Sequence, residues 1–185
     1  MKTSLKLPST TPEITGSLWH PILKAKLLLP NLIGQKVEEL KRGGFKIVTL
    51  NGSFDLFHAG HLKMLTEAFD LKGDKGVVIL ALNSDKSIKS YKSKKRPIIE
   101  LEYRLKIIAS SVFIDFVTWF DEDDPIRLLS TIQPDIHVNG AEYGEDCIES
   151  QTVKDHGGRL VLVEKFDQLS TSSIIKKIQN EAIDG

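Results

Sequence analysis

The chain has 185 residues, of which 41% are apolar and 27% charged, a composition typical of one globular domain with a packed core. The formal net charge is zero, so no field of the whole chain attracts nucleic acid or an anionic membrane. Cys147 is the only cysteine, which excludes an internal disulfide. No run approaches the ~18 apolar residues of a membrane span, and the polar N-terminus is unlike a signal peptide. These features predict a cytoplasmic protein that binds neither nucleic acid nor membrane.

Residues 1–44 precede the first strand pattern and are expected to form an N-terminal extension. Its beginning is rich in Ser, Thr and Pro, whereas Ile33, Val37 and Leu40 recur with helical spacing. Gly43 and Gly44 then end the helical pattern. We therefore expect a partly helical extension followed by one main domain over residues 45–185.

Beyond the extension, short apolar runs alternate with helical patterns. The predicted strands cover residues 45–50, 76–82, 113–120, 135–140 and 159–164. Helical spacing relates apolar residues within 62–69, 101–108 and 174–178, and Asp124 before Pro125 is typical of a helix start. Apolar strands separated by helices predict an α/β fold, namely a Rossmann-like, open, doubly wound parallel sheet of five strands with helices on both faces. Such sheets bind ligands beyond the carboxyl ends of their strands.

The segment after the first predicted strand reads NGSFDLFHAGH and places His58 and His61 at the start of a helix. Their spacing puts both imidazoles on the side where free backbone N–H groups and the positive end of the helix dipole point. Gly60 omits a side chain where an anion would approach. This arrangement favours a phosphate or nucleotide site. The alternatives are a structural capping network and a zinc site, for which no Cys/His cluster supplies further ligands.

This stretch resembles the HxGH signature of the nucleotidyltransferase superfamily, which includes cytidylyltransferases and phosphopantetheine adenylyltransferase. Segments after other predicted strands match as well: LNSDKSIK, KSKKRPI followed by LEYRLKII, PDIHVNGAEY and LSTSSIIKKI. The likeness covers roughly residues 44–180 and is strongest to the adenylyltransferase domain of heptose-phosphate enzymes. Ser53 stands where those proteins often have cysteine, Asn139 replaces their usual lysine, and Ala141-Glu142 replace Gly-Asp.

The resemblance implies roles for residues in each matching segment. Catalytic roles fall to His58, His61 and Arg96. Nucleotide or phosphate binding is implied for Asn51, Gly52, Ser53, Phe54, Gly60, Asn83, Asp85, Lys92, Arg104, Ser170, Thr171, Ser172 and Ser173. Contact with the phosphate acceptor is implied for Asp55, Asn139, Gly140 and Glu142. No protein metal ligand is expected, because Mg²⁺ would arrive with the triphosphate and be held largely by its oxygens and water.

Several of these residues also have ordinary structural interpretations. The basic residues of 92–96 form either a solvated loop or a mobile flap over phosphates. Arg104 is either a surface arginine or a phosphate ligand, and the hydroxyls of 170–173 can cap the last helix. Asp55 can position His58, help to organise metal, or form an Asx turn. His137 fits no ligand pattern and is expected to be structural.

The predicted reaction is in-line nucleotidyl transfer, in which a sugar-phosphate oxygen attacks the α-phosphorus of a nucleoside triphosphate and pyrophosphate leaves. The resemblance implies ATP and D-glycero-β-D-manno-heptose 1-phosphate as substrates, ADP-heptose for lipopolysaccharide core as product, and a homodimer. One alternative is a CTP-dependent cytidylyltransferase of glycerol 3-phosphate or a similar small phosphate. Another is a non-catalytic nucleotide-sensing domain.

Overall fold

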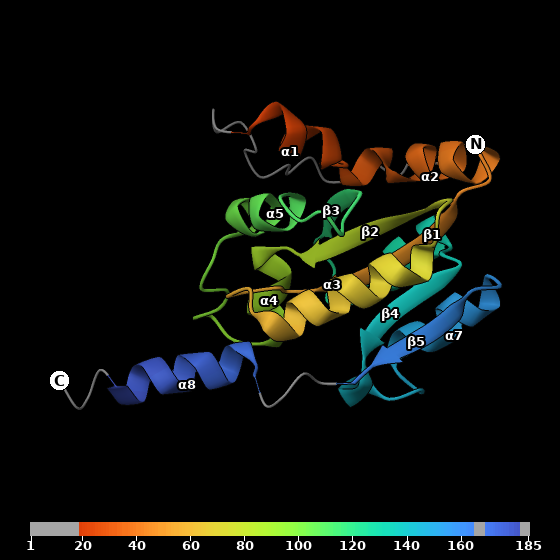
Figure 1. Ribbon diagram of the computed structural model, residues 1–185. Helices are drawn as coiled ribbons and strands as arrows, with labels where there is room; N and C mark the ends of the chain where they lie inside the picture. Colours follow the sequence, from red (N-terminus) through yellow and green to blue (C-terminus); the bar gives the residue numbers. More distant parts are fainter. Residues whose placement is uncertain (1–18, 165–168, 182–185) are drawn as a thin grey trace, which may run out of the picture.

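Five parallel strands form the sheet at the centre of the molecule (Figure 1). The computed structural model describes residues 19–164 and 169–181, so the predicted polar start of the extension lies outside the described residues. The strand order is β3-β2-β1-β4-β5, and every pairing between neighbours is parallel. The strands are β1 (Lys46–Gly52), β2 (Gly76–Asn83), β3 (Phe116–Phe120), β4 (Ile136–Gly140) and β5 (Arg159–Val163). This confirms the predicted doubly wound α/β fold.

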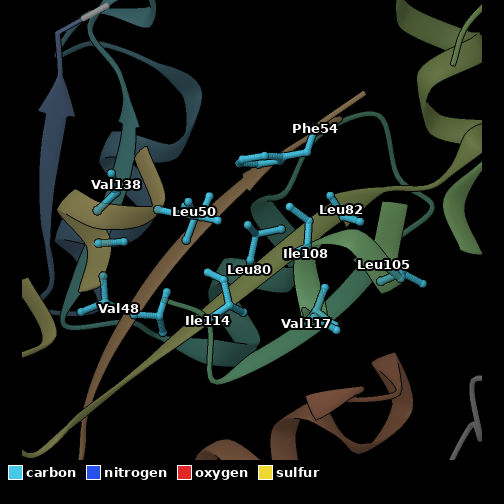
Figure 2. Packing of buried hydrophobic residues seen from close by; sticks show 14 of the residues in the cluster. Val48, Leu50, Phe54, Leu80, Leu82, Leu105, Ile108, Ile114, Val117 and Val138 are labelled. Atoms are coloured by element: carbon cyan, nitrogen blue, oxygen red, sulfur yellow. The ribbon is translucent and has the colours of Figure 1, made fainter. Parts of the chain in front are cut away.

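Helices cover both faces of the sheet and enclose two apolar clusters. On one face, α3 (Ala59–Lys72) and α5 (Leu101–Ala109) cover the cluster that contains Val48 and Leu50 (Figure 2). On the other, α2 (Ile33–Arg42) and α6 (Ile126–Ile132) contribute to the cluster that contains Ile47. Successive side chains of a strand point to opposite faces, which explains why the strands are apolar at consecutive positions.

The remaining helices lie around the sheet and at its ends. They are α1 (Pro21–Lys26), α4 (Asp85–Tyr91), α7 (Ile148–Asp155) and α8 (Thr171–Glu181), with short 3₁₀ turns η1 (Pro30–Leu32) and η2 (Ala141–Tyr143). The last helix, α8, projects from the body of the sheet (Figure 1). No helix within the described parts of the chain has the length and apolarity needed to cross a membrane.

The chain before β1 pairs with the outer strand β3. Leu28 N–H donates to the Val117 carbonyl oxygen at 2.9 Å, and Leu27 forms a parallel bridge with the same residue. Lys26 Nζ donates to the Ser111 carbonyl oxygen at 2.7 Å. This pairing satisfies backbone groups at a sheet edge that would otherwise stay open. The described part of the predicted extension therefore packs on the sheet and closes one of its edges.

Three predictions of local structure were wrong or incomplete. The third strand begins at Phe116 instead of residue 113, because Asp115 enters the sheet by bonding Val78 through both its backbone and its carboxylate. Ile114 is buried without being in the strand, so its apolar character reflected packing alone. The helix expected at Pro125 begins one residue later, although Asp124 Oδ1 still accepts from the first helical N–H at 3.0 Å. Helix α4 was missed because seven residues are too few for a clear periodicity.

Candidate active site

A cavity of about 710 Å³ opens beyond the carboxyl ends of the strands. It lies where the strand order reverses between β1 and β4, the position at which open parallel sheets bind ligands. Its volume is within the roughly 300–1,000 Å³ of small-molecule sites. Many predicted site residues line it: Asn51, Gly52, Ser53, Phe54, His58, Gly60, His61, Asn83, Lys92, Arg96, Asn139, Gly140, Glu142, Ser170, Thr171 and Ser172.

His58 begins α3 and caps it with its own ring. Its backbone is extended, and Nδ1 accepts a hydrogen bond from Gly60 N–H at 3.1 Å. Burial lowers the pKa of His58 below its usual value, so the ring is neutral near pH 7. Since Nδ1 acts as an acceptor, the proton of the neutral ring is on Nε2. Capping therefore occupies one nitrogen of His58 and leaves the other able to donate to a ligand.

His61 lies one turn further along α3 and stacks on His58, with 3.8 Å between the ring centroids. It also packs against Phe54, with centroids 4.8 Å apart. Burial, followed by the neighbouring His58 and Lys92, lowers the pKa of His61 to about 3. Its Nδ1 is buried with no hydrogen-bond partner among the described residues, which leaves Nε2 as the nitrogen accessible from the cavity. The two histidines thus offer neutral donors near pH 7.

The absence of a side chain at Gly60 lets neighbouring protein groups lie close to its backbone. A Cβ at this position would lie 3.0 Å from Cε1 and 3.1 Å from Nδ1 of His58. It would also lie 3.4 Å from the carbonyl oxygen of Leu169, in the segment that leads into α8. The glycine therefore permits the close approach of the histidine ring and of this segment.

Some hydroxyl groups at the start of α8 cap the helix, and others belong to residues that line the cavity. Ser170 Oγ accepts from Ser173 N–H at 3.1 Å, and Ser173 Oγ accepts from Ser170 N–H at 2.9 Å. This reciprocal pattern is a helix cap, as the structural alternative predicted. Thr171 Oγ1 donates to the Asp55 carbonyl oxygen at 2.7 Å. Ser172 lines the cavity whereas Ser173 does not, and the ligand contact of Ser173 stays a prediction.

Lys92 and Arg96 bring positive charge to the cavity wall. Lys92 Nζ donates to Ser53 Oγ at 3.2 Å, and burial together with the nearby Arg96 lowers the pKa of Lys92. Arg96 Nη2 pairs with Asp55 Oδ2 at 2.8 Å, and its side chain is only 14% exposed. The basic loop, defined here as residues 92–99, is therefore held against the site by specific contacts.

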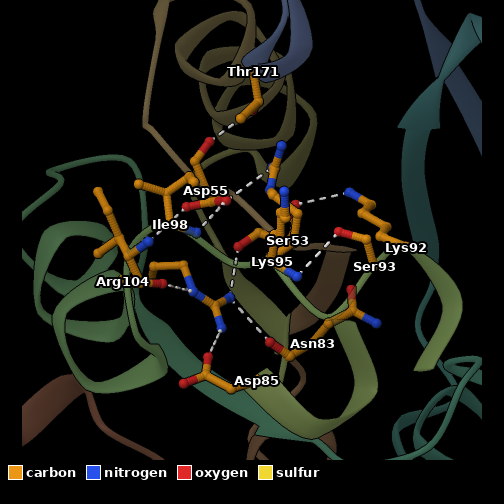
Figure 3. A network of polar contacts seen from close by, with 12 residues as sticks. Ser53, Asp55, Asn83, Asp85, Lys92, Ser93, Lys95, Ile98, Arg104 and Thr171 are labelled. Carbon is orange, nitrogen blue, oxygen red and sulfur yellow. Dashed lines mark hydrogen bonds and ion pairs between the residues drawn. The ribbon is translucent and has the colours of Figure 1, made fainter. Parts of the chain in front are cut away.

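Three residues predicted to contact a ligand do not line the cavity. Arg104, Asp85 and Asp55 instead belong to a network of polar contacts (Figure 3). Arg104 is 1% exposed, and its guanidinium donates to the carbonyl oxygens of Ser53 and Asn83 and to Asp85 Oδ1. Asp55 is fully buried and also does not line the cavity. Buried charged groups need such partners, and here the partners are loops that carry cavity residues. In this structure Arg104, Asp85 and Asp55 thus support the loops that carry cavity residues, and their ligand contacts stay predictions.

The end of the cavity beside β4 is acidic. Glu142, Glu149 and Glu164 line it, of which the sequence analysis had selected only the first. Asn139 Nδ2 lies 3.7 Å from Cys147 Sγ, and burial with the nearby Glu149 raises the pKa of this thiol. Carboxylates at this end disfavour phosphate and suit neutral groups that donate hydrogen bonds.

The donor set at the histidine end suits an anion better than a resident metal ion. Imidazoles, an ammonium, a guanidinium and hydroxyls line it, whereas Mg²⁺ prefers carboxylate and other oxygen ligands. Within residues 19–164 and 169–181, no group of three or more His, Cys, Asp or Glu is placed to hold a metal. A Mg²⁺ ion carried by a triphosphate is compatible with these residues.

Comparison with known proteins agrees with this geometry. The family model described as cytidylyltransferase-like matches residues 49–181, which include the paired histidines and the start of α8. The chain belongs to the cytidylyltransferase-like family. This match covers the five-stranded sheet from within β1 onward, together with the cavity at its carboxyl edge.

Similar curated proteins of this family are longer than the chain. Bifunctional protein HldE of Geobacter metallireducens is 40% identical over 169 residues, which are 90% of this chain and 34% of that protein. Its counterpart in Citrifermentans bemidjiense is 43% identical over 169 residues, with the same coverage. The chain thus spans about a third of the length of these relatives.

Two solved structures resemble the fold of this chain at low sequence identity. A lipopolysaccharide core biosynthesis protein from Thermoplasma volcanium has a TM-score of 0.54 at 23% identity, covering 67% of this chain and all of that one. Pantothenate synthetase from Thermus thermophilus has a TM-score of 0.50 at 14% identity, covering 76% and 68% of the two chains. At this identity they support the fold alone.

Some cavity residues had no place in the predicted site. Asp123 and Asp124 lie shortly after β3, in the stretch 120–124 that the rule of ligand binding beyond strand ends indicates, but no role was predicted for either. Cys147 and Glu149 reach the cavity from the start of α7, and no recognised spacing marks them. Tyr91 ends α4, the helix that the sequence pattern did not indicate.

Proposed function

We propose that the chain transfers an adenylyl group from ATP to a sugar phosphate and releases pyrophosphate. The observation that carries this proposal is the convergence, in one cavity at the topological switch point, of two neutral histidines with Lys92 and Arg96. Neutral donors and fixed cations together suit a polyphosphate whose charge shifts during reaction. Family membership supports the same reaction class.

The charges around the basic loop support binding of an anion. Among the described residues, the ion pairs and charge interactions of Lys92, Arg96 and Arg104 involve two carboxylates, those of Asp55 and Asp85. One positive charge is therefore left without a counterpart in this network, and the lowered pKa of Lys92 reflects its burial beside other cations. A phosphate group placed here would balance that charge.

The two ends of the cavity suggest where the two substrates bind. The end with Lys92 and Arg96 suits the acceptor phosphate, and Asp123 and Asp124 nearby can accept hydrogen bonds from sugar hydroxyls. The acidic end beside β4 suits the uncharged base and ribose. We therefore assign Asn139, Gly140 and Glu142 to the nucleoside, in place of the acceptor contacts that the resemblance implied.

The chemistry requires positioning and charge stabilisation without a protein nucleophile. The acceptor oxygen attacks the α-phosphorus, the bond from the α-phosphorus to the oxygen that bridges to the β-phosphate breaks, and pyrophosphate leaves. His58 and His61 would donate from Nε2 to phosphate oxygens as charge moves toward the leaving group. Lys92 and Arg96 would hold the acceptor phosphate in line.

The heptose assignment rests on sequence likeness. The segments around His58, Arg96 and Ser170 resemble heptose-phosphate adenylyltransferases, and HldE proteins are about 40% identical over the same part of the chain. We therefore propose D-glycero-β-D-manno-heptose 1-phosphate as acceptor and ADP-heptose as product. The homodimer and the cytoplasmic location stay predictions.

Pyrophosphate release over a panel of substrates tests the function. The purified chain is assayed with ATP or CTP and Mg²⁺ against heptose 1-phosphate, glucose 1-phosphate and glycerol 3-phosphate. The expected result is release that needs both ATP and heptose 1-phosphate, with ADP-heptose identified by mass spectrometry. Activity only with CTP and glycerol 3-phosphate would replace this assignment by the cytidylyltransferase alternative. Tight nucleotide binding without turnover on any acceptor would favour the sensing domain.

A further inference from the structure

Asp55 joins two segments that form the cavity wall, although it does not line the cavity itself. Its carboxylate accepts from the backbone N–H groups of Ile98 and Ile99, both at 2.9 Å, and pairs with Arg96 Nη2 at 2.8 Å (Figure 3). The side chain is fully buried. Every contact of this carboxylate is thus made to the basic loop, residues 92–99.

The backbone of Asp55 makes a second connection. Its carbonyl oxygen accepts from Thr171 Oγ1 at 2.7 Å, at the start of α8. Thr171 lines the cavity together with its neighbours Ser170 and Ser172. One residue therefore links the basic loop, through its carboxylate, to the helix start that faces the histidines, through its carbonyl group.

The turn that contains Asp55 is conformationally unusual. Phe54 and Leu56 have φ values of 44° and 49°, a left-handed region that is unfavourable for residues with side chains. Such backbone persists only where surrounding contacts impose it. Here the contacts are the Phe54 ring against His61 and the hydrogen bonds of Asp55 on both sides. The turn is therefore a rigid link between the two segments.

We propose that Asp55 is a positioning residue that couples nucleotide binding at the start of α8 to the placement of Arg96 in the basic loop. This inference rests on the proposed function. A triphosphate that contacts the start of α8 stabilises the Thr171–Asp55 bond and with it the strained turn. The carboxylate then holds the basic loop, so that Arg96 meets the acceptor phosphate in a fixed position.

The variant Asp55→Asn separates the two halves of this link, because it keeps the backbone carbonyl and changes the carboxylate. An amide NH₂ would face N–H donors or Arg96, which frees the basic loop. We expect the affinity for ATP to stay near wild type, while KM for the acceptor rises about 10- to 100-fold. Hydrogen exchange of the amides of residues 92–99 should lose protection in the free protein. If the affinity for ATP weakened by the same factor as the acceptor KM rose, the proposal would be overturned. Unchanged hydrogen-exchange protection of residues 92–99 would also overturn it.

Asp115→Asn is the matched control. The carboxylate of Asp115 also accepts from a backbone N–H, that of Val78 at 2.8 Å, and also pairs with a cation, Lys72 at 2.8 Å. It precedes β3 and so lies at the amino ends of the strands, opposite the cavity. This variant is expected to lower stability while both kinetic constants and the loop protection stay near wild type. If it moved acceptor KM as much as Asp55→Asn does, general destabilisation would explain both.

Thr171→Val tests the other half of the link and does not depend on the folding of the Asp55 variant. It removes the hydroxyl that bonds the Asp55 carbonyl. In the wild-type chain, saturating ATP should increase protection of residues 92–99, and in this variant the increase should be lost. An undiminished increase would contradict the coupling. Hydrogen exchange can be measured on a chain that does not turn over. If the chain binds ATP but releases no pyrophosphate with any acceptor, the proposed function is refuted, and the exchange data still decide the coupling.

Discussion

His61 and His137 are both buried histidines whose pKa values are lowered by burial, to about 3 and about 4. Each also has one ring nitrogen without a hydrogen-bond partner among the described residues, Nδ1 in His61 and Nε2 in His137. His137 lies in the middle of the sheet, with Nδ1 2.9 Å from Thr49 Oγ1, whereas His61 lines the cavity. Burial and a shifted pKa therefore do not identify a site here. What distinguishes the site histidine is its position beyond the strand ends and at the start of a helix.

The largest effect is expected from His61→Ala. Loss of one donor to a developing charge typically lowers turnover about 10²–10³-fold. Because the ring lies on the cavity wall, the free energy of unfolding should change by about 1 kcal/mol or less. Pyrophosphate release and urea unfolding measure the two quantities. Turnover close to wild type would remove His61 from the mechanism and leave the two histidines functionally alike.

His137→Ala should show the opposite pattern. The residue has no exposed surface, and its loss leaves a void and takes away the partner of the Thr49 hydroxyl. The free energy of unfolding is expected to fall by about 1–3 kcal/mol. Turnover per folded molecule should stay near the wild-type value. A large fall in turnover at unchanged stability would show that the sheet histidine takes part in the reaction.

A smaller effect is expected in the pH dependence of stability. The unfolded chain binds protons on these histidines as pH falls below about 6.5, whereas the folded chain holds His61 and His137 neutral to about 3 and about 4. The contribution of the two neutral histidines to the free energy of unfolding is therefore complete above pH 6.5 and is lost as the pH falls toward 4. Urea unfolding of the wild-type chain at pH 7, 6 and 5 should show decreasing stability. In His137→Ala the decrease should be shallower, and an identical slope would contradict the assigned burial effect.

Particular residues show how far local sequence could predict the site. His58, His61 and the start of α8 were predicted because strand-to-helix transitions and cap residues leave local patterns. Arg104 and Asp55 were expected at the ligand, whereas the structure pairs them with protein groups that local patterns do not report: Arg104 bonds Asp85, 19 residues away, and Asp55 bonds Ile98, 43 residues away. Asp123 lies in the stretch that the strand-end rule indicates, although no role was predicted for it, while Cys147 reaches the cavity from the start of α7 and fits no recognised spacing.

The amino-acid sequence by itself determined the alternation of strands and helices, the parallel sheet and the two histidines at a helix start. These follow from hydrophobic periodicity and capping, which act over a few residues. The tertiary structure decided which charges face the ligand. It turned Arg104 and Asp55 inward, left Lys92 and Arg96 on the cavity wall, and brought Glu142, Glu149 and Glu164 to the same cavity. The reason is that Arg104 and Asp55 form ion pairs at the edge of the sheet, where loops that are distant in sequence meet.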